Sequence, residues 1–162
     1  MILLSWNVRG IGAARKRGMI SGFLAQFKAS IIILQETKCQ EMTDTIAKEL
    51  WSCPSIKWEV VDAIGHSGGI LLAWDSTFFD SINVIKGQYS LGIQFRDLSY
   101  GKLWCVGGVY GPTRYRDRNA FWEELNTLKQ NWNLPWIFAG DFNAIRYCQE
   151  KKPPAVRISA SM

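Results

Sequence analysis

The segment WIFAGDFNAI, Trp136 to Ile145, joins an apolar run to two polar side chains. The run before Gly140 has the composition of a buried strand, and Asp141 and Asn143 follow it directly. A buried strand has no structural need for a carboxylate at its end, because burying an unpaired charge is costly. The segment therefore predicts a strand whose end faces an open site.

Three further segments repeat this pattern of an apolar strand that ends on a polar residue. They are the runs at 2–6, 30–35 and 102–109. In layered α/β proteins, ligands bind outside the carboxyl ends of the strands. We therefore expect the polar residues at the four ends to share one site: Asn7, Glu36, Tyr110, and Asp141 with Asn143.

Amphipathic segments between these strands predict three helices. Each has apolar residues at the three- and four-residue spacing of a helix face. Thr43 is a candidate N-cap of the second helix. The expected inward faces are Ile20, Phe23, Leu24 and Phe27 within 13–28; Ile46, Ala47 and Leu50 after Thr43; and Phe121, Leu125, Leu128 and Trp132 in a helix that begins near Asp117.

The middle of the chain predicts antiparallel strands. Segments 57–63 and 68–74 form one expected pair, and 81–95 gives two more strands with a break near 87–90. Buried strands covered by helices, with antiparallel strands between them, indicate a layered α/β fold. The chain is too short for a closed eight-fold α/β barrel.

Composition places the chain among globular proteins of one domain. It has 162 residues, of which 48% are hydrophobic and 20% charged, and its net charge of +5 gives a mild bias toward polyanionic partners. No two of its four cysteines have the Cys-x-x-Cys spacing, and it has one histidine, so a Cys/His zinc cluster is not expected. Without an apolar stretch long enough to span a membrane or a signal peptide, we expect no membrane partner. We predict reduced thiols and an intracellular location, nuclear or cytoplasmic.

The residue types at the strand ends suit metal-assisted phosphodiester hydrolysis. Glu36 is a hard oxygen ligand of the kind that Mg²⁺ prefers, and Asp141 is suited to orient or deprotonate a water. Asn7 and Asn143 can hold phosphate oxygens without adding negative charge, and the Tyr110 hydroxyl can donate to one. The alternative is that these are ordinary turn and cap residues, for which Asp and Asn are also favoured.

Five segments in order resemble the endonuclease/exonuclease/phosphatase superfamily: LSWNVRGIG, LQETK, SGGILLAW, VYGP and PWIFAGDFNAIRY. They are most similar to the endonuclease domain of plant LINE-type (non-LTR) retrotransposons. The resemblance implies a DNase I-like α/β sandwich of two sheets with helices on the outer faces. It also implies a Mg²⁺-dependent or Mn²⁺-dependent enzyme that cuts DNA, and a reverse transcriptase domain in a longer parent chain.

Carried over by position, the resemblance makes Glu36 the metal ligand and Asn7 the asparagine beside metal and phosphate. Tyr110 matches the tyrosine that contacts the phosphate. Asp141 matches the aspartate that aligns or activates water, and Asn143 the asparagine that steadies the transition state.

Other positions match the family less specifically. Lys38 lies where the family often has a basic residue, and Arg9 and Arg114 are further candidates for phosphate contact. Ser67 and Gly68 match a Ser-Gly-Gly turn whose role we expect to be structural.

The family pattern continues beyond the segments present in this chain. It ends with an Asp and a Ser-Asp-His that have no counterpart here, and His66 is expected to be an ordinary loop histidine. We therefore expect residues 1–162 to be the N-terminal portion of one domain, with 148–162 as a polar basic tail. The missing half is expected to supply most of the second sheet, so that this chain alone would expose an apolar face.

Three functions remain open at this stage. The first is a DNA-nicking endonuclease. The second is a truncated, catalytically dead fragment that binds nucleic acid weakly. The third is a phosphatase acting on a small phosphorylated substrate, because a fold does not fix a function.

Overall fold

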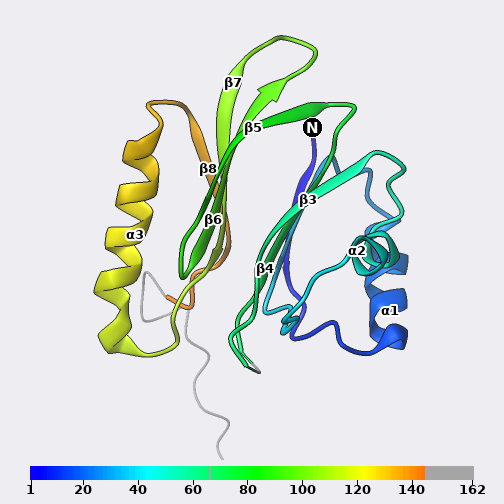
Figure 1. Cartoon of the computed structure of the whole chain (residues 1–162), viewed down its shortest axis with the longest axis horizontal. Helices are drawn as coiled ribbons and strands as arrows, with labels where there is room; N and C mark the ends of the chain where they lie inside the picture. Colours follow the sequence, from blue (N-terminus) through cyan, green and yellow to red (C-terminus); the bar gives the residue numbers. More distant parts are fainter. Residues whose placement is uncertain (66, 145–162) are drawn as a thin grey trace, which may run out of the picture.

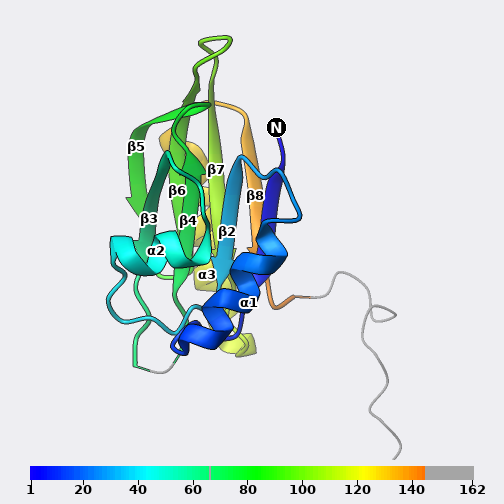
Figure 2. The same ribbon diagram turned by 90° about the vertical axis from the view of Figure 1, so that its right-hand side faces the viewer.

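The computed structural model describes residues 1–65 and 67–144. Two four-stranded sheets pack face to face, with strand orders β1-β2-β4-β3 and β5-β6-β7-β8. Helices α1 and α2 cover the outer face of the first sheet, and α3 covers the second (Figures 1 and 2). The elements are β1 (Leu3–Asn7), α1 (Ala14–Leu24), β2 (Ile31–Gln35), α2 (Asp44–Leu50), β3 (Ile56–Val61), β4 (Ile70–Asp75), β5 (Phe79–Lys86), β6 (Ser90–Asp97), β7 (Leu103–Tyr110), η1 (Tyr115–Asp117), α3 (Arg118–Asn131) and β8 (Trp136–Asp141).

The layered α/β prediction is confirmed, but the expectation about the second sheet is wrong. This chain supplies four strands of that sheet, from Phe79 to Asp141. Its inner face is covered by the first sheet, so it is not left exposed. The strands at 79–97 belong to the second sheet, which the sequence pattern did not indicate.

The inner core lies between the two sheets and explains the continuous apolar runs. In β2, Ile31 and Ile33 face the second sheet, whereas Ile32 and Leu34 face the helices. β4 alternates in the same way, so both strands are buried on both faces. Such strands need apolar residues at every position rather than at every second one.

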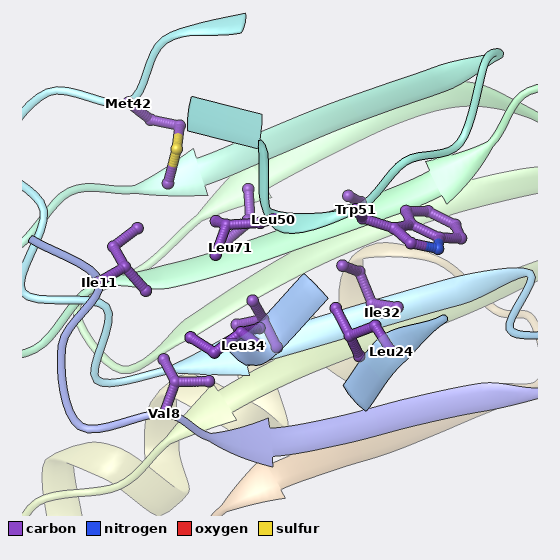
Figure 3. Close-up of a cluster of buried hydrophobic side chains, with 11 residues drawn as sticks. Val8, Ile11, Leu24, Ile32, Leu34, Met42, Leu50, Trp51 and Leu71 are labelled. Atoms are coloured by element: carbon purple, nitrogen blue, oxygen red, sulfur yellow. The ribbon is translucent and has the colours of Figure 1, made fainter. Parts of the chain in front are cut away.

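A second core lies between the first sheet and the helices α1 and α2 (Figure 3). Leu24 and Leu50 are buried there as predicted, and the Thr43 side chain accepts from the Ile46 backbone N–H as the expected N-cap. The prediction that Phe23 and Phe27 face inward is wrong, because each side chain is 41% exposed. Helix α1 ends at Leu24, so the helical spacing no longer applies to Phe27.

Two expectations near the C-terminal strand are also wrong. Among the described residues, strand β8 pairs only with β7 and lies at the edge of its sheet, so it is half-buried, and Ile137 is 40% exposed. Trp132 does not join the buried face of α3, because it follows the last helical residue. Its ring stacks instead on Trp136, with a centroid distance of 5.4 Å.

Cys39, Cys53 and Cys105 are free thiols, and Cys148 lies outside the described residues. Burial raises the pKa of Cys105 to about 11, which keeps that thiol protonated at neutral pH. No helix within residues 1–65 and 67–144 has the length and apolar character needed to cross a membrane.

One carboxylate of helix α3 forms hydrogen bonds with the turn between β5 and β6. Glu124 accepts hydrogen bonds from the backbone N–H groups of Gln88 and Tyr89, at 3.0 Å each, and from the Ser90 hydroxyl at 2.6 Å. A Cβ at Gly87 would collide with this carboxylate. The conformation of the turn and the position of α3 therefore depend on the same contact.

Replacing Glu124 by alanine should lower the free energy of unfolding by about 1–3 kcal/mol, because partly buried donors lose a charged acceptor. Glu123→Ala is the matched control, since Glu123 is an exposed neighbour on the same helix. The measurement is urea denaturation followed by tryptophan fluorescence. Equal urea midpoints for the two variants would show that the hydrogen bonds of Glu124 do not stabilise the fold.

Candidate active site

The polar strand ends meet at one end of the sandwich, the lower end in Figure 1. β1 is parallel to β2 with Asn7 opposite Gln35, and β7 is parallel to β8 with Tyr110 opposite Asp141. The Asn7 amide Nδ2 donates to Asp141 Oδ2 at 2.8 Å. This hydrogen bond joins the first and last strands, and therefore the two sheets, at the site.

Asp141 is held in place by donors on both carboxylate oxygens. Besides the bond from Asn7, the Asn143 backbone N–H donates to Oδ1 at 3.0 Å. The Asn143 side-chain amide donates to the Gly111 carbonyl at 2.8 Å, and the Gly111 N–H donates to the Asp141 carbonyl at 2.7 Å. The ends of β7 and β8 therefore form one hydrogen-bonded unit with Asp141 fixed at its centre.

Glu36 is half-buried beside this unit, and Lys38 lies next to it. The Lys38 ammonium is 3.0 Å from Glu36 Oε1. Partial burial alone would raise the pKa of Glu36, but hydrogen bonds from Lys38 and Asn7 and the charges of Lys38 and Arg9 outweigh it and lower the pKa. Glu36 is thus ionised, and its carboxylate already attracts a cation.

Tyr110 lies between the two carboxylates. Burial raises its pKa, and the charges of Glu36 and Asp141 and a hydrogen bond with Glu36 raise it further. The phenol therefore stays protonated at neutral pH, and its one O–H donates to Glu36 until another acceptor replaces that carboxylate.

Backbone strain is concentrated at this site. Within 1–65 and 67–144, four non-glycine residues have positive φ, and all of them belong to the predicted site: Arg9 (52°), Glu36 (55°), Lys38 (53°) and Asn143 (47°). Such conformations cost about 1–3 kcal/mol each and cluster where function requires a set geometry. Nothing in the sequence pattern indicated this strain, although Asn tolerates the left-handed region better than most residues.

The Ser-Gly-Gly turn supports the strained segment after β2. The Lys38 and Thr37 N–H groups donate to the carbonyls of Gly68 and Gly69, at 3.0 and 3.2 Å. Gly69 has a φ of +90°, and a Cβ there would collide with the Thr37 hydroxyl. The Ser67 hydroxyl donates within its own turn, to the Ile64 carbonyl at 3.4 Å.

An open cleft of about 610 Å³ lies beside the strand ends and shares Tyr110 with them. Its walls are the loop before β4, the turn between β5 and β6, and the segment after β7. Arg114 lines it, whereas Arg9, which follows β1, does not. The cleft is therefore an approach to the polar cluster and does not contain most of it.

The donor set fits a hard divalent cation. Mg²⁺ typically takes one or two carboxylates and keeps several waters, and Glu36 and Asp141 supply two carboxylates. The Asn7 side-chain oxygen accepts from the Arg9 backbone N–H at 3.1 Å, so Asn7 presents its amide N–H groups to the carboxylates. Within the described part of the chain, no three or more His, Cys, Asp or Glu side chains gather in a group that could hold a metal ion, so a bound cation would depend on these two carboxylates and on water. His66 and the tail at 148–162 lie outside the described residues.

Arg118 is a site neighbour that the sequence did not single out from the other basic residues. Its Nη2 donates to the Asn143 carbonyl at 3.1 Å, and its guanidinium lies 5.4 Å from the centroid of the Tyr115 ring. The sequence signal was only its position at the start of the helix after Tyr110.

Replacing Lys38 by glutamine should raise the pKa of Glu36, because the variant loses a charged donor and a nearby positive charge. The measurement is a ¹³C NMR titration of the glutamate carboxyl groups, with Glu36→Gln used to assign the resonance. Lys28→Gln, an exposed lysine on another surface, should leave the pKa of Glu36 unchanged. An unaltered titration in Lys38→Gln would show that the ion pair does not set the charge of Glu36.

Comparison with known proteins agrees with this fold. An exodeoxyribonuclease of Bacillus subtilis (strain 168) is 28% identical over 176 residues, covering 99% of this chain and 66% of that protein. The structure of the AP endonuclease LMAP from Leishmania major superposes with a TM-score of 0.65 at 14% identity, over 85% of this chain and 53% of that one. For ANGEL2, a 2',3'-cyclic phosphatase, the TM-score is 0.67 at 14% identity, over 88% and 54%.

This chain thus spans between about half and two thirds of the length of these relatives. The structural matches, at 14% identity, support the fold alone. The sequence also matches the model of the Endonuclease/Exonuclease/phosphatase family over residues 4–154, which is most of its length. The chain therefore belongs to the endonuclease/exonuclease/phosphatase family.

Proposed function

We propose that the strand-end cluster hydrolyses phosphodiester bonds of DNA with the help of a divalent metal ion. The observation that carries this proposal is the Asn7–Asp141 hydrogen bond, which places a fixed carboxylate next to the ionised Glu36 and the protonated Tyr110. Two carboxylates and a neutral donor around one open position are what water attack on a phosphate requires.

Glu36 would hold Mg²⁺ or Mn²⁺, with the Asn7 side chain beside it. The ion, when bound, supplies positive charge that polarises the phosphoryl group. Asp141 would orient the attacking water and accept its proton. Because each Asp141 oxygen already accepts one fixed N–H, the carboxylate keeps its direction and still has lone pairs for a water.

Neutral and basic groups would bind the phosphate. Tyr110 would donate from its hydroxyl to a phosphate oxygen. One N–H of the Asn143 amide is used by Gly111, and the second would steady the charge that develops in the transition state. Lys38, Arg9 and Arg114 would contact flanking phosphates.

DNA is the proposed substrate because the curated relative is an exodeoxyribonuclease. A finer proposal, that the chain derives from a plant LINE-type retrotransposon and is joined to a reverse transcriptase in a longer protein, rests on the five motifs alone. It is an inference from resemblance, and the relatives named above carry no such description.

Two other functions stay in competition. One is a chain that binds nucleic acid weakly without cutting it, for which the net charge of +5 is sufficient. The similarity in fold to a 2',3'-cyclic phosphatase favours a small phosphorylated substrate. Both alternatives predict intact plasmid, and only the phosphatase predicts release of phosphate from small esters.

The purified 162-residue protein should nick supercoiled plasmid in the presence of Mg²⁺, and EDTA should stop the reaction. Asp141→Asn and Glu36→Gln should each slow nicking by about 10²–10⁴, because they remove the proposed base and the metal ligand. Agarose electrophoresis of relaxed and supercoiled forms gives the rates.

The matched control is Asp80→Asn, an exposed carboxylate on β5 away from the strand ends. It should nick at the wild-type rate. Nicking that persists in Asp141→Asn and Glu36→Gln would come from a contaminant and would refute the proposal. No nicking by the wild type, with phosphate released from a 2',3'-cyclic nucleotide, would favour the phosphatase.

A further inference from the structure

The segment Arg114–Arg118, with the sequence RYRDR, places an aromatic ring in solvent between two residues that line the cleft, Arg114 and Asp117. Tyr115 is 83% exposed, although a tyrosine usually covers its ring with other apolar atoms. Arg114, its neighbour, lines the cleft together with Tyr110. Tyr115 therefore lies in the element that follows Tyr110, whose hydroxyl the proposed function assigns to the phosphate.

Arg118 fixes the position of this ring relative to the site. Its guanidinium lies 5.4 Å from the Tyr115 ring centroid, and its Nη2 donates to the Asn143 carbonyl at 3.1 Å. One side chain thus connects the exposed ring to the backbone next to Asp141. The contact occupies one side of the ring and leaves the rest of it exposed.

The charge around the ring matches a polyanion. Three arginines and one aspartate lie within five residues, and Asp117 is already paired with Arg116 at 3.6 Å. No carboxylate of residues 1–65 or 67–144 forms an ion pair with Arg114 or Arg118. The buried Arg118 Nε also has no hydrogen-bond partner. Two positive charges therefore remain to attract phosphates.

An exposed aromatic ring between positive charges is suited to nucleic acid whose bases are unpaired. Bases inside a duplex stack on each other and present no free face, whereas a single strand or an extruded nucleotide does. Stacking on an aromatic side chain tolerates any base, because every base has a π-face. Ile64, which is 84% exposed in the loop that lines the other side of the cleft, adds apolar surface for the same strand.

We infer that Tyr115 is a stacking platform for an unpaired base of the substrate, with Arg114 binding an adjacent phosphate. This rests on the proposed function only in taking nucleic acid as the substrate. It goes beyond it by assigning specificity: the chain should prefer single-stranded or unpaired DNA next to the cut over a continuous duplex. Tyr115 would select and position the substrate and takes no part in the chemistry.

The test measures binding without cleavage. Fluorescence anisotropy of a fluorescein-labelled twelve-nucleotide oligothymidylate is recorded in EDTA at low salt, with wild type, Tyr115→Ala and Tyr115→Trp. Tyr115→Ala should weaken binding about tenfold, which is within the range for one lost base stack, and Tyr115→Trp should restore it. A hairpin duplex of twelve base pairs should show less than a twofold effect of either change.

Tyr100→Ala is the matched control. Tyr100 is 79% exposed in the turn between β6 and β7, at the opposite end of the sandwich from the strand-end cluster (Figure 1). This variant should bind the oligothymidylate as the wild type does. Thermal melts should coincide for all variants, because the Tyr115 ring is exposed.

Three results would overturn the inference: wild type that does not bind the oligothymidylate, Tyr115→Ala that binds it normally, or an equal loss on the duplex. Each is separate from the nicking assay. If Tyr115→Ala binds normally while Asp141→Asn abolishes nicking, the stacking platform is refuted and the proposed function stands. If binding depends on Tyr115 but plasmid is never cut, the platform stands and the nuclease activity is refuted.

Discussion

The hydrogen bond from Asn7 to Asp141 depends on how closely the two sheets approach. Its partners are 134 residues apart and lie on different sheets, so it forms only when the inner core is packed. Gly108 in β7 permits this approach: a Cβ there would lie 2.9 Å from Ile33 and 3.3 Å from Ile70, on the facing sheet. Packing at the centre of the sandwich therefore sets the geometry at its end, and a wider sheet separation would pull the two halves of the site apart.

The strained backbone at the site is held by the same contacts between strand ends. The Gly10 and Ile11 N–H groups donate to the carbonyls of Glu36 and Thr37, and Lys38 is held by Gly68. These bonds over-determine the left-handed conformations of Arg9, Glu36 and Lys38, which would otherwise relax. The result is a set of side chains fixed before any substrate arrives, which reduces the reorganisation that the reaction requires.

The sequence was sufficient to predict which strands exist and that their polar ends meet. Continuous apolar runs identified β2 and β4, and helical spacing identified α3 with its buried Phe121 and Leu125. Exposure was harder to predict, because apolar composition does not distinguish an edge strand such as β8 from a central one. Side-chain contacts between distant segments away from the strand ends were not predicted. Glu124 has the appearance of any surface residue of a helix, and its three partners in the β5–β6 turn appear only after folding.

Different parts of this fold control chemistry and specificity. The strand-end cluster consists of a fixed carboxylate, an ionised glutamate balanced by Lys38, and a protonated phenol, and this set suits any phosphate ester. The nuclease and the phosphatase named above share the fold, and a fold does not fix a substrate. Under the proposed function, selection would come from the cleft wall, where loops tolerate changes in sequence without disturbing the core. Arg114 and Tyr115 lie in such a segment, and Arg118 connects it to Asn143. A change in substrate would therefore require new side chains only there, while the two sheets and the bond between Asn7 and Asp141 stay as they are.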